Sequence, residues 1–306
     1  MDIGERQIAR FSPRPLPDAR LAFRGGLVLR GPRRFGALSG MLVEGTRLLA
    51  VSDTGTWFAA DLVLEDRRLV GLNDTRLIER LDTDGSTIRT KRRGDAEALA
   101  KGDGGILVLI ERARALLAYA ADGLDVDWSA TPQALPLSRE ERRAGRRGIE
   151  AMTFLPNGDL LLIAEGRDGD AKQTPAFILG GRRLAIARRD GFAITGADAL
   201  PGGDVILVER RYGGGFDVAM RVRRIGADAF ATAAPADGPI LLEAGFSAEI
   251  DNMEAVAAQV IDGEIVLTLL SDDNDSFLQR TLLLRFVLTD PLPRPNPQRA
   301  SAEPPG

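Results

Sequence analysis

The chain of 306 residues contains no cysteine and no histidine. Without a thiol or an imidazole it cannot build a Ser-His-Asp triad, a cysteine nucleophile, a histidine-ligated haem or a zinc site with the usual nitrogen and sulfur ligands. Disulfides are excluded as well, so cysteine usage says nothing about the redox compartment. Any reactivity must therefore rest on carboxylates, arginines, hydroxyls and hard metal ions.

Long apolar runs and an excess of positive charge are also missing. The longest unbroken apolar stretch, Ala115–Ala121, is far shorter than the roughly 20 residues that a membrane helix needs. A formal net charge of −4 and a pI near 5.2 provide no basic field for nucleic acid. Because 44% of the residues are hydrophobic, the chain can bury a core. We expect a soluble globular protein with no membrane span and no nucleic-acid partner.

The two ends of the chain differ in composition from its middle. Residues 1–18 carry three prolines and no apolar segment of the signal-peptide type, and they are predicted to be an N-terminal extension. Residues 290–306 contain six prolines and little that could enter a core, which predicts a disordered tail. The folded domain is therefore predicted over residues 19–289.

Five segments repeat one pattern, in which a short strand, a glycine-bearing turn and a more apolar strand follow one another and end in an acid. The segments are Leu38–Asp53, Asp95–Glu111, Gly148–Glu165, Thr195–Glu209 and Asn252–Asp272. Turn pairs such as Asn157-Gly158 and Asp262-Gly263 reach positive φ at low cost, which favours tight β-hairpins. Each hairpin is followed by one or two further strand-like runs.

A period near 50 residues with about four short strands indicates the blade of a β-propeller. Five repeats predict an all-β fold with five blades, and a sixth could occupy the longer spacers. The run Leu21–Arg30 has no blade of its own, so we expect it to pair with the last blade and close the ring. The alternative is a β-sandwich or a pair of small β domains.

The acids of the repeats are predicted to meet at one mouth of the propeller channel. The start of the innermost strand and the end of the second strand lie at the same face, because the two strands are antiparallel. The first strands begin with Glu97, Glu150 and Glu254, with Ser39 and Gly196 at the equivalent positions, and the second strands end in Asp53, Glu111, Glu165, Glu209 and Asp272. Eight carboxylates repel one another unless cations neutralise them or some are protonated. We predict all eight as metal ligands, for Ca²⁺ first and Mg²⁺ second.

Arginines lie beside several of these acids. Arg112 and Arg210 follow second-strand acids, Arg147 precedes Glu150, and Arg34 lies just before the first repeat. One interpretation is that arginines form salt bridges that hold the blades in register. The other is that these four bind the oxygens of an anionic substrate.

A set of ordered motifs resembles the phytase-like family, described as the esterase-like activity of phytase family, whose members are β-propeller proteins widespread in proteobacteria. The motifs are FRGGLVL (Phe23–Leu29), RFGALSGM (Arg34–Met41), AVSDTGTW (Ala50–Trp57), DAEAL (Asp95–Leu99), GIEAM (Gly148–Met152), LLIAEG (Leu161–Gly166), ILVERR (Ile206–Arg211), AMRVRRI (Ala219–Ile225), IDNMEAVA (Ile250–Ala257), LLSDDN (Leu269–Asn274) and QRTLLLRF (Gln279–Phe286). Two positions depart from the family pattern. Arg147 stands where a lysine is usual, and Asp275 stands where an aromatic residue is usual.

The resemblance implies a metal-dependent hydrolase of a phosphoester or another small anionic ester, with Glu97, Glu150 and Glu254 as catalytic residues. Family members are commonly exported, which implies a periplasmic or exported protein whose signal has been removed, although a cytoplasmic location stays open. A calcium-dependent lactonase and a non-catalytic ligand-binding or scaffold propeller are the alternatives. We expect a monomer.

Overall fold

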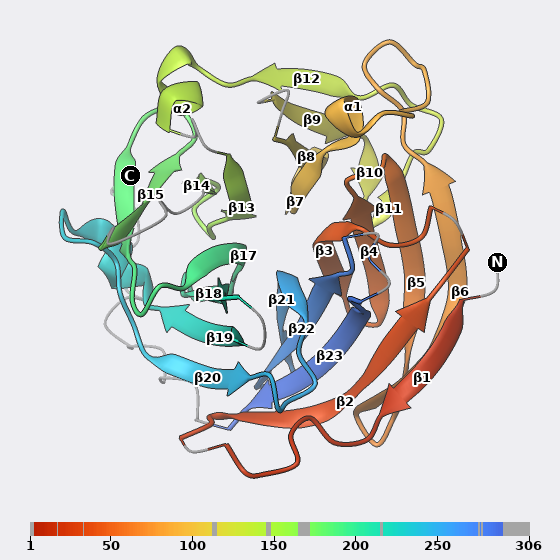
Figure 1. The fold of residues 1–306 in the computed structure, drawn as a ribbon. Helices are drawn as coiled ribbons and strands as arrows, with labels where there is room; N and C mark the ends of the chain where they lie inside the picture. The colour runs from red at the N-terminus through yellow and green to blue at the C-terminus, as the bar shows by residue number, and fades with distance from the viewer. Residues whose placement is uncertain are drawn as a thin grey trace.

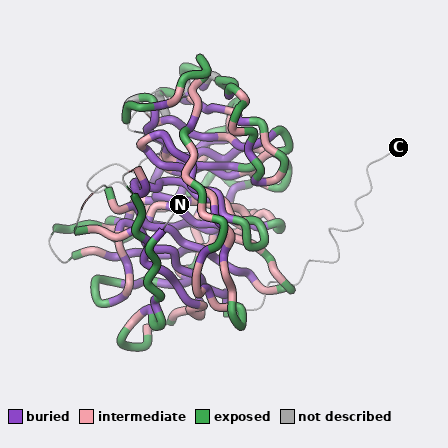
Figure 2. Tube along the Cα trace, turned by 90° about the vertical axis from the view of Figure 1, so that its right-hand side faces the viewer, coloured by how far each residue is buried: buried purple, intermediate pink, exposed green. Residues whose placement is uncertain are grey.

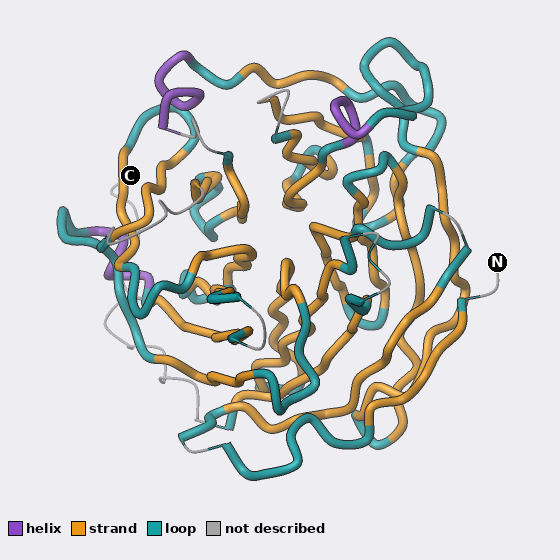
Figure 3. Tube along the Cα trace, in the orientation of Figure 1, coloured by secondary structure: helices purple, strands orange, loops and turns teal. Residues whose placement is uncertain are grey.

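The computed structural model describes residues 3–16, 18–32, 34–111, 115–144, 148–164, 172–214, 217–274, 276 and 278–289. The strands form antiparallel sheets around a central axis (Figure 1). The prediction of an all-β propeller is thus confirmed. The helices of this part, α1 (Lys91–Gly94), α2 (Arg139–Ala144) and the 3₁₀ helix η1 (Ala227–Ala231), are short connections (Figure 3). None of them is long and apolar enough to cross a membrane.

The described strands form one nine-stranded sheet, three four-stranded sheets and a two-stranded sheet. Because one parallel bridge, Gly25↔Leu69, joins the two parts of the nine-stranded sheet, we divide it there and call the resulting units blades 1 to 5, each written from the innermost strand outward. Blade 1 contains β3 (Leu38–Glu44), β4 (Arg47–Ser52), β5 (Thr56–Glu65) and β6 (Arg68–Glu79). Blade 2 contains β7 (Ala96–Gly102), β8 (Gly105–Ile110), β9 (Ala115–Tyr119) and β12 (Gln133–Pro136), and β10 (Ala121–Asp122) pairs with β11 (Asp125–Val126) beside it. Blade 3 contains β13 (Ile149–Phe154), β14 (Leu160–Ala164), β15 (Gln173–Ile178) and β16 (Arg183–Ala187).

Blade 4 contains β17 (Ala193–Ala199), β18 (Val205–Tyr212), β19 (Val218–Ile225) and β20 (Ile240–Gly245). Blade 5 combines the two ends of the described chain. Its inner strands are β21 (Asn252–Ile261), β22 (Glu264–Asp272) and β23 (Thr281–Leu288), and its outer strands are β2 (Leu21–Arg30) and β1 (Gly4–Ile8).

The N-terminal strand closes the ring, as the sequence predicted. β2 pairs antiparallel with β23 from Leu21↔Leu288 to Leu29↔Thr281. Residues 4–8, which the sequence analysis placed in an N-terminal extension, form β1 and pair along β2. The predicted tail at 290–306 lies outside the described residues.

Apolar side chains fill the seams between neighbouring blades. Buried residues follow the strands, and exposed ones gather at the turns (Figure 2). Because side chains alternate along a strand, each inner strand contributes to the seams on both of its sides. Between blades 1 and 2, for example, the buried Trp57 ring packs edge-on against Tyr119 with a centroid distance of 5.0 Å. The hairpin turns follow the sequence prediction, since Asp262 and Gly263 both have positive φ between β21 and β22.

Candidate functional site

A β-bulge lies near the start of every innermost strand. The pairing register shifts by one residue at Ser39, Glu97, Glu150, Thr195 and Glu254. A bulge redirects the side chain of the extra residue. The same five residues line the narrow centre of the propeller. The structure therefore brings Glu97, Glu150 and Glu254 together at one mouth of the channel.

Small residues close the channel directly below this ring. The residue after each bulge is glycine or alanine, and the inner strands approach closely there. A Cβ atom on Gly40 would lie 2.9 Å from the Leu99 nitrogen, and one on Gly196 would lie 2.7 Å from the Glu254 carbonyl oxygen. The space that remains is about 10 Å³, which is room for about one water molecule. The mouth is thus a shallow acidic bowl with a closed floor.

The fourth repeat differs from the sequence-based alignment by one residue on both strands. Ile194 pairs with Glu209 and Gly196 pairs with Val208, so Thr195 occupies the bulge that the sequence analysis assigned to Gly196. In blades 1, 2 and 5, the residue just before the bulge pairs with Ser52, Ile110 and Ser271 of the second strand, respectively. The acid that ends the repeat, Asp53, Glu111 or Asp272, is the residue that follows. The residue in that next position of blade 4 is Arg210. A shift of one residue turns a strand side chain to the opposite face of the sheet.

Glu209 consequently lies inside blade 4 and not with the other acids. It is 1% exposed, and one carboxylate oxygen accepts a hydrogen bond of 2.5 Å from Arg223, which is also buried. Arg223 donates a second hydrogen bond of 2.8 Å to Asp237. Burial raises the pKa of Glu209, and the Arg223 guanidinium opposes this shift. This placement corrects the expectation that Glu209 faces the channel mouth.

Arg210 brings a positive charge to the mouth. Its guanidinium lies 3.3 Å from a carboxylate oxygen of Glu254. The same carboxylate accepts a hydrogen bond of 2.7 Å from the Asn252 amide. Burial raises the pKa of Glu254 to about 7, against the opposing effect of Arg210.

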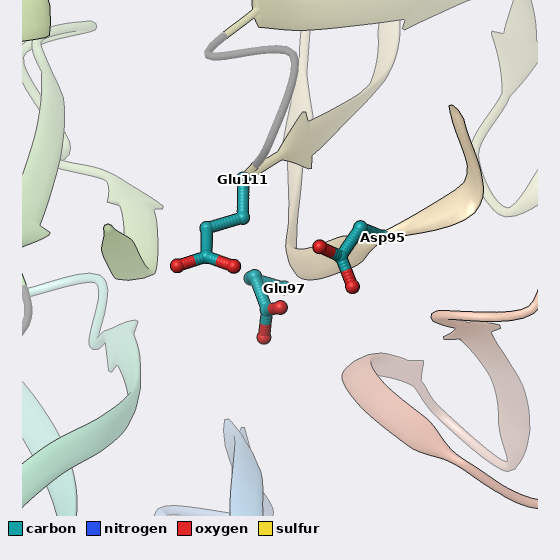
Figure 4. A group of neighbouring side chains, drawn as sticks. All are labelled: Asp95, Glu97 and Glu111. Carbon is teal, nitrogen blue, oxygen red and sulfur yellow. The ribbon is translucent and has the colours of Figure 1, made fainter. Parts of the chain in front are cut away.

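Three carboxylates of blade 2 form the tightest acidic group in the described part of the chain. Ligand atoms of Asp95, Glu97 and Glu111 all lie within 4.8 Å of one another (Figure 4). Asp95 directly precedes β7 and Glu111 directly follows β8. The Asp95 amide donates a hydrogen bond of 2.8 Å to the Lys91 carbonyl of α1, and the Glu111 amide donates one of 2.9 Å to the Asp95 carbonyl. Backbone contacts thus hold both acids beside the bulge of Glu97.

Sequence reasoning did not select Asp95 as a site residue. Asp95 begins the second repeat and the motif DAEAL, and it lies two positions before Glu97. The corresponding residues of the other repeats are Ala37, Gly148, Ala193 and Asn252, so no acidic pattern marks this position. Its spacing from Glu97 was the only signal available.

Glu150 lies next to Glu111 across the seam between blades 2 and 3. A Cβ atom on Gly148 would lie 2.5 Å from an oxygen of Glu111 and 2.8 Å from an oxygen of Glu150. Gly148 also has a φ of +130°, a conformation that residues with side chains rarely adopt. Glycine is therefore required where the two carboxylates approach the backbone.

The electrostatic environment of Glu97 reflects this crowding. Burial is the largest cause that raises its pKa, to about 10, and the carboxylates of Glu150, Glu111, Asp95 and Glu254 raise it further, in that order. In the absence of a bound cation, Glu97 thus carries a proton at neutral pH. Three of these four carboxylates, Glu111, Glu150 and Glu254, belong to the predicted set of acids, and the fourth, Asp95, does not.

Lys91 of α1, in the connection between blades 1 and 2, brings a positive charge close to Asp53, Asp95 and Asp272. Lys91 in α1 is hydrogen-bonded to one carboxylate oxygen of Asp53, and the other oxygen of Asp53 is buried without a partner. The pKa of Lys91 is raised, first by that hydrogen bond. Asp272 is buried nearby, and burial, with Glu254, Asp53 and Asp273 as further causes, raises its pKa to about 7.

The remaining predicted residues lie elsewhere. Arg34 forms an ion pair with Glu79, which ends the outermost strand of blade 1. Arg112, Arg147 and Glu165 lie outside the described residues.

Comparison with known proteins identifies the family. The family described as "Phytase-like: Esterase-like activity of phytase" matches residues 33–275. The chain belongs to the phytase-like family. This match covers the acidic mouth and all five innermost strands, so the resemblance given by the sequence motifs is confirmed. No curated protein matches the chain.

Solved structures with a similar fold are distant in sequence from this phytase-like chain. A PQQ-bound aldose sugar dehydrogenase from Streptomyces coelicolor is 13% identical, with a TM-score of 0.46 over 89% of this chain and 100% of the other. An α-L-arabinofuranosidase from Clostridium thermocellum is 10% identical, with a TM-score of 0.45 over 78% and 82%. The β-propeller domain of Cps50 from Myceliophteria thermophila is 12% identical, with a TM-score of 0.37 over 92% and 88%. None of the three bears on the activity of this chain.

Proposed function

We propose that this phytase-like protein is a metal-dependent hydrolase of a small anionic ester, with a phosphoester as the first candidate. Ca²⁺ is the leading cation and Mg²⁺ the second. The observation that carries the proposal is the group of Asp95, Glu97 and Glu111, whose ligand atoms lie within 4.8 Å of one another at the channel mouth. Glu150 and Glu254 stand beside this group and complete the acidic bowl.

The donor atoms suit a hard divalent cation. All three side chains offer carboxylate oxygens, the ligands that Ca²⁺ and Mg²⁺ prefer. Oxygens that share one calcium ion at the usual bond lengths lie at most about 5 Å apart, which agrees with the measured separation. The proton that Glu97 holds at neutral pH would be replaced by the cation. Binding should therefore release protons, which calorimetry in buffers of different ionisation enthalpy can detect.

A divalent cation held by these residues would neutralise charge on the substrate and lower the pKa of a water molecule. Glu150, next to Glu111, is positioned to accept a proton from that water. Arg210, which is ion-paired with Glu254, and Lys91, which is hydrogen-bonded to Asp53, can donate hydrogen bonds to anionic oxygens. Because the inner strands leave a space of only about 10 Å³ below the acids, a substrate would reach the proposed cation from the acidic face.

Thermal unfolding with added metal and hydrolysis assays test the proposal together. We expect Ca²⁺ to raise the melting temperature, since a ligand that binds only the folded state stabilises it. Hydrolysis of phosphomonoesters or inositol phosphates should require the metal. It should fall by at least about 100-fold in Glu97→Gln and in Glu150→Gln, which remove a charge and keep the side-chain shape. The matched control is Glu65→Gln, at an exposed glutamate that ends β5, far from the mouth.

The outcomes separate the alternative functions. Stabilisation by calcium with hydrolysis of lactones alone would favour the lactonase. Stabilisation with phosphoesters, carboxyl esters and lactones all intact would favour a non-catalytic binding propeller. If neither calcium nor magnesium changes the melting temperature, the metal proposal is wrong, and the acids act as partners of the nearby cations.

The proposal includes a periplasmic or exported location and a monomeric state. Weak calcium sites of extracellular modules work at the millimolar concentrations found outside cells. Cell fractionation and light scattering of the purified protein test these two points.

A further inference from the structure

Four arginines are deeply buried in the described part of the chain, and one of them differs from the other three. They are Arg80, Arg221, Arg223 and Arg285. Arg221 and Arg223 each form ion pairs with two carboxylates. Arg80 donates a hydrogen bond to the Gly94 carbonyl and lies within the electrostatic reach of an aspartate. Arg285 has neither kind of partner among the described residues.

The surroundings of Arg285 in β23 provide donors but no counter-charge. The residue is 3% exposed, and its Nη1 atom is buried without a hydrogen-bond partner. Burial lowers its pKa, and no acidic group of the described chain opposes this shift. Thr268 of β22 is fully buried, and its hydroxyl also lacks a partner. The two residues are directly paired across the strands, so their side chains project from the same face of blade 5.

This face lies against blade 1, at the seam where the ring closes. Leu283 and Leu270, two positions along the same strands, belong to the apolar cluster shared by blades 5 and 1. Opposite Arg285, β2 bulges between Phe23 and Gly26. Within this bulge, Gly25 forms the bridge to Leu69 of blade 1 and comes so close that a Cβ atom would lie 2.4 Å from the Leu69 oxygen. The Nη1 atom of the guanidinium is therefore buried where blade 5 meets blade 1.

A buried, unpaired guanidinium is unstable unless something compensates its charge. Arginine does not lose its proton in proteins, so it cannot become neutral in the way that a buried lysine does. Its N–H group and the threonine O–H group are donors that need an acceptor. A water molecule could accept both bonds, but it would supply no charge and would bring hydrogens that need acceptors in turn. A small anion satisfies both donors and the charge.

We propose that a small inorganic anion of halide size binds between Arg285 and Thr268 at the seam between blades 5 and 1. Such a site is independent of the acidic mouth and of the proposed hydrolysis. Its role is to hold the closing strands together by pairing the one deeply buried arginine for which the described chain provides neither an ion pair nor a hydrogen bond.

Thermal unfolding at constant ionic strength tests the site, with chloride exchanged against gluconate, which is too large to enter. We expect the melting temperature of the full chain to rise by about 2 °C for each tenfold increase in chloride above the dissociation constant. Arg285→Met should abolish this dependence, and Thr268→Val should weaken the chloride affinity several-fold. Arg30→Met, at an exposed arginine that ends β2, should keep the dependence of the native protein.

Bromide anomalous scattering from crystals of the native protein provides a measurement that needs no variant. A peak between the Arg285 guanidinium and the Thr268 hydroxyl would support the site. The proposal is overturned if chloride and gluconate give the same melting temperature and no bromide peak lies at the seam. It is also overturned if Arg285→Met folds and retains the full chloride dependence.

Discussion

Blades 2 and 4 present the same strand positions to the channel mouth but opposite charges. Blade 2 places Glu97 at its bulge and Glu111 just after its second strand. Blade 4 has Thr195 at its bulge, and Arg210, within its second strand, holds the position that corresponds to Glu111. The repeated hairpin thus provides a position at which a side chain reaches the mouth, and the residue at that position decides the charge. The consequence is an asymmetric mouth, with three carboxyl groups gathered on blade 2 and a guanidinium on blade 4.

This asymmetry suits the capture of an anionic ester. A uniform ring of carboxylates would repel such a substrate, whereas Arg210 provides a donor across the bowl from the proposed metal. The ion pairs inside blade 4 have a different task. Arg223 and Glu209 are both buried, so they neutralise each other within the sheet and do not reach solvent.

The largest change in stability is expected from the buried ion pair inside blade 4. Arg223→Met leaves Glu209 buried without its partner, which should lower the free energy of unfolding by about 3 to 5 kcal/mol. Urea unfolding measures the change. Arg67→Met, which removes an exposed ion pair with Asp262 and Glu264, should cost less than about 1 kcal/mol. Equal losses in the two variants would contradict the distinction between buried and exposed pairs.

The next effect is the pH dependence of stability without metal. In the folded protein, burial raises the pKa of Glu254 to about 7, and burial together with like charges raises that of Asp272 to about 7 and that of Glu97 to about 10. The folded state then binds more protons than the unfolded state, so stability is greatest below pH 4 to 5 for these groups and is lost as the pH rises through 7 and toward 10. Melting temperatures between pH 5 and 9 should reveal this fall, which Glu97→Gln should reduce.

Added Ca²⁺ provides the control for this pH series. If a cation occupies the bowl, it should raise the melting temperature most at high pH. At high pH the carboxyl groups lose their protons, and without a cation the resulting carboxylates repel one another. A calcium effect that is the same at pH 5 and pH 9 would argue against binding at these carboxylates.

A smaller effect is expected at the contact between blades 2 and 3. Gly148→Ala places a methyl group against the oxygens of Glu111 and Glu150 at a φ of +130°. The strain should lower stability by about 1 to 3 kcal/mol and weaken calcium binding, because the two carboxylates must move apart. Calorimetry of calcium binding checks this. Gly158→Ala, at a positive φ with no neighbouring atom within 4 Å, separates backbone strain from displacement of the acids.

The smallest expected effect is on substrate binding, and it tests the proposed role of Arg210 as a donor to the substrate. Arg210→Gln removes the cation that faces Glu254, and we expect about a tenfold rise in KM for a phosphoester with a smaller change in kcat. Calcium affinity should stay the same or rise, because the bowl loses a positive charge. Steady-state kinetics at saturating calcium measure the split. An unchanged KM would mean that Arg210 serves only as a partner of Glu254.

Several features of this protein could be predicted because they depend on local pattern. The repeated turns and apolar strands identified the propeller, and the strand Leu21–Arg30, left over from the repeats, identified the closure. The acids Glu97, Glu150 and Glu254 precede Ala in a repeated motif, so their common position followed from the repeat itself. None of these inferences required knowledge of distant contacts.

Other features depend on register and on burial, which only the tertiary structure decided. The run ILVERR contains adjacent charges at Glu209 and Arg210, and a one-residue shift exchanges the faces to which they point. The bulge of β17 set that register and turned Glu209 inward. Asp95 joined the site through backbone contacts with α1 and Glu111, and Arg285 became a buried cation because the N-terminal strand packs beside it. By itself, the sequence determined the repeated strands and the acids of the regular repeats, because these follow from local periodicity. Which charges meet was decided by the pairing of strands distant in the chain.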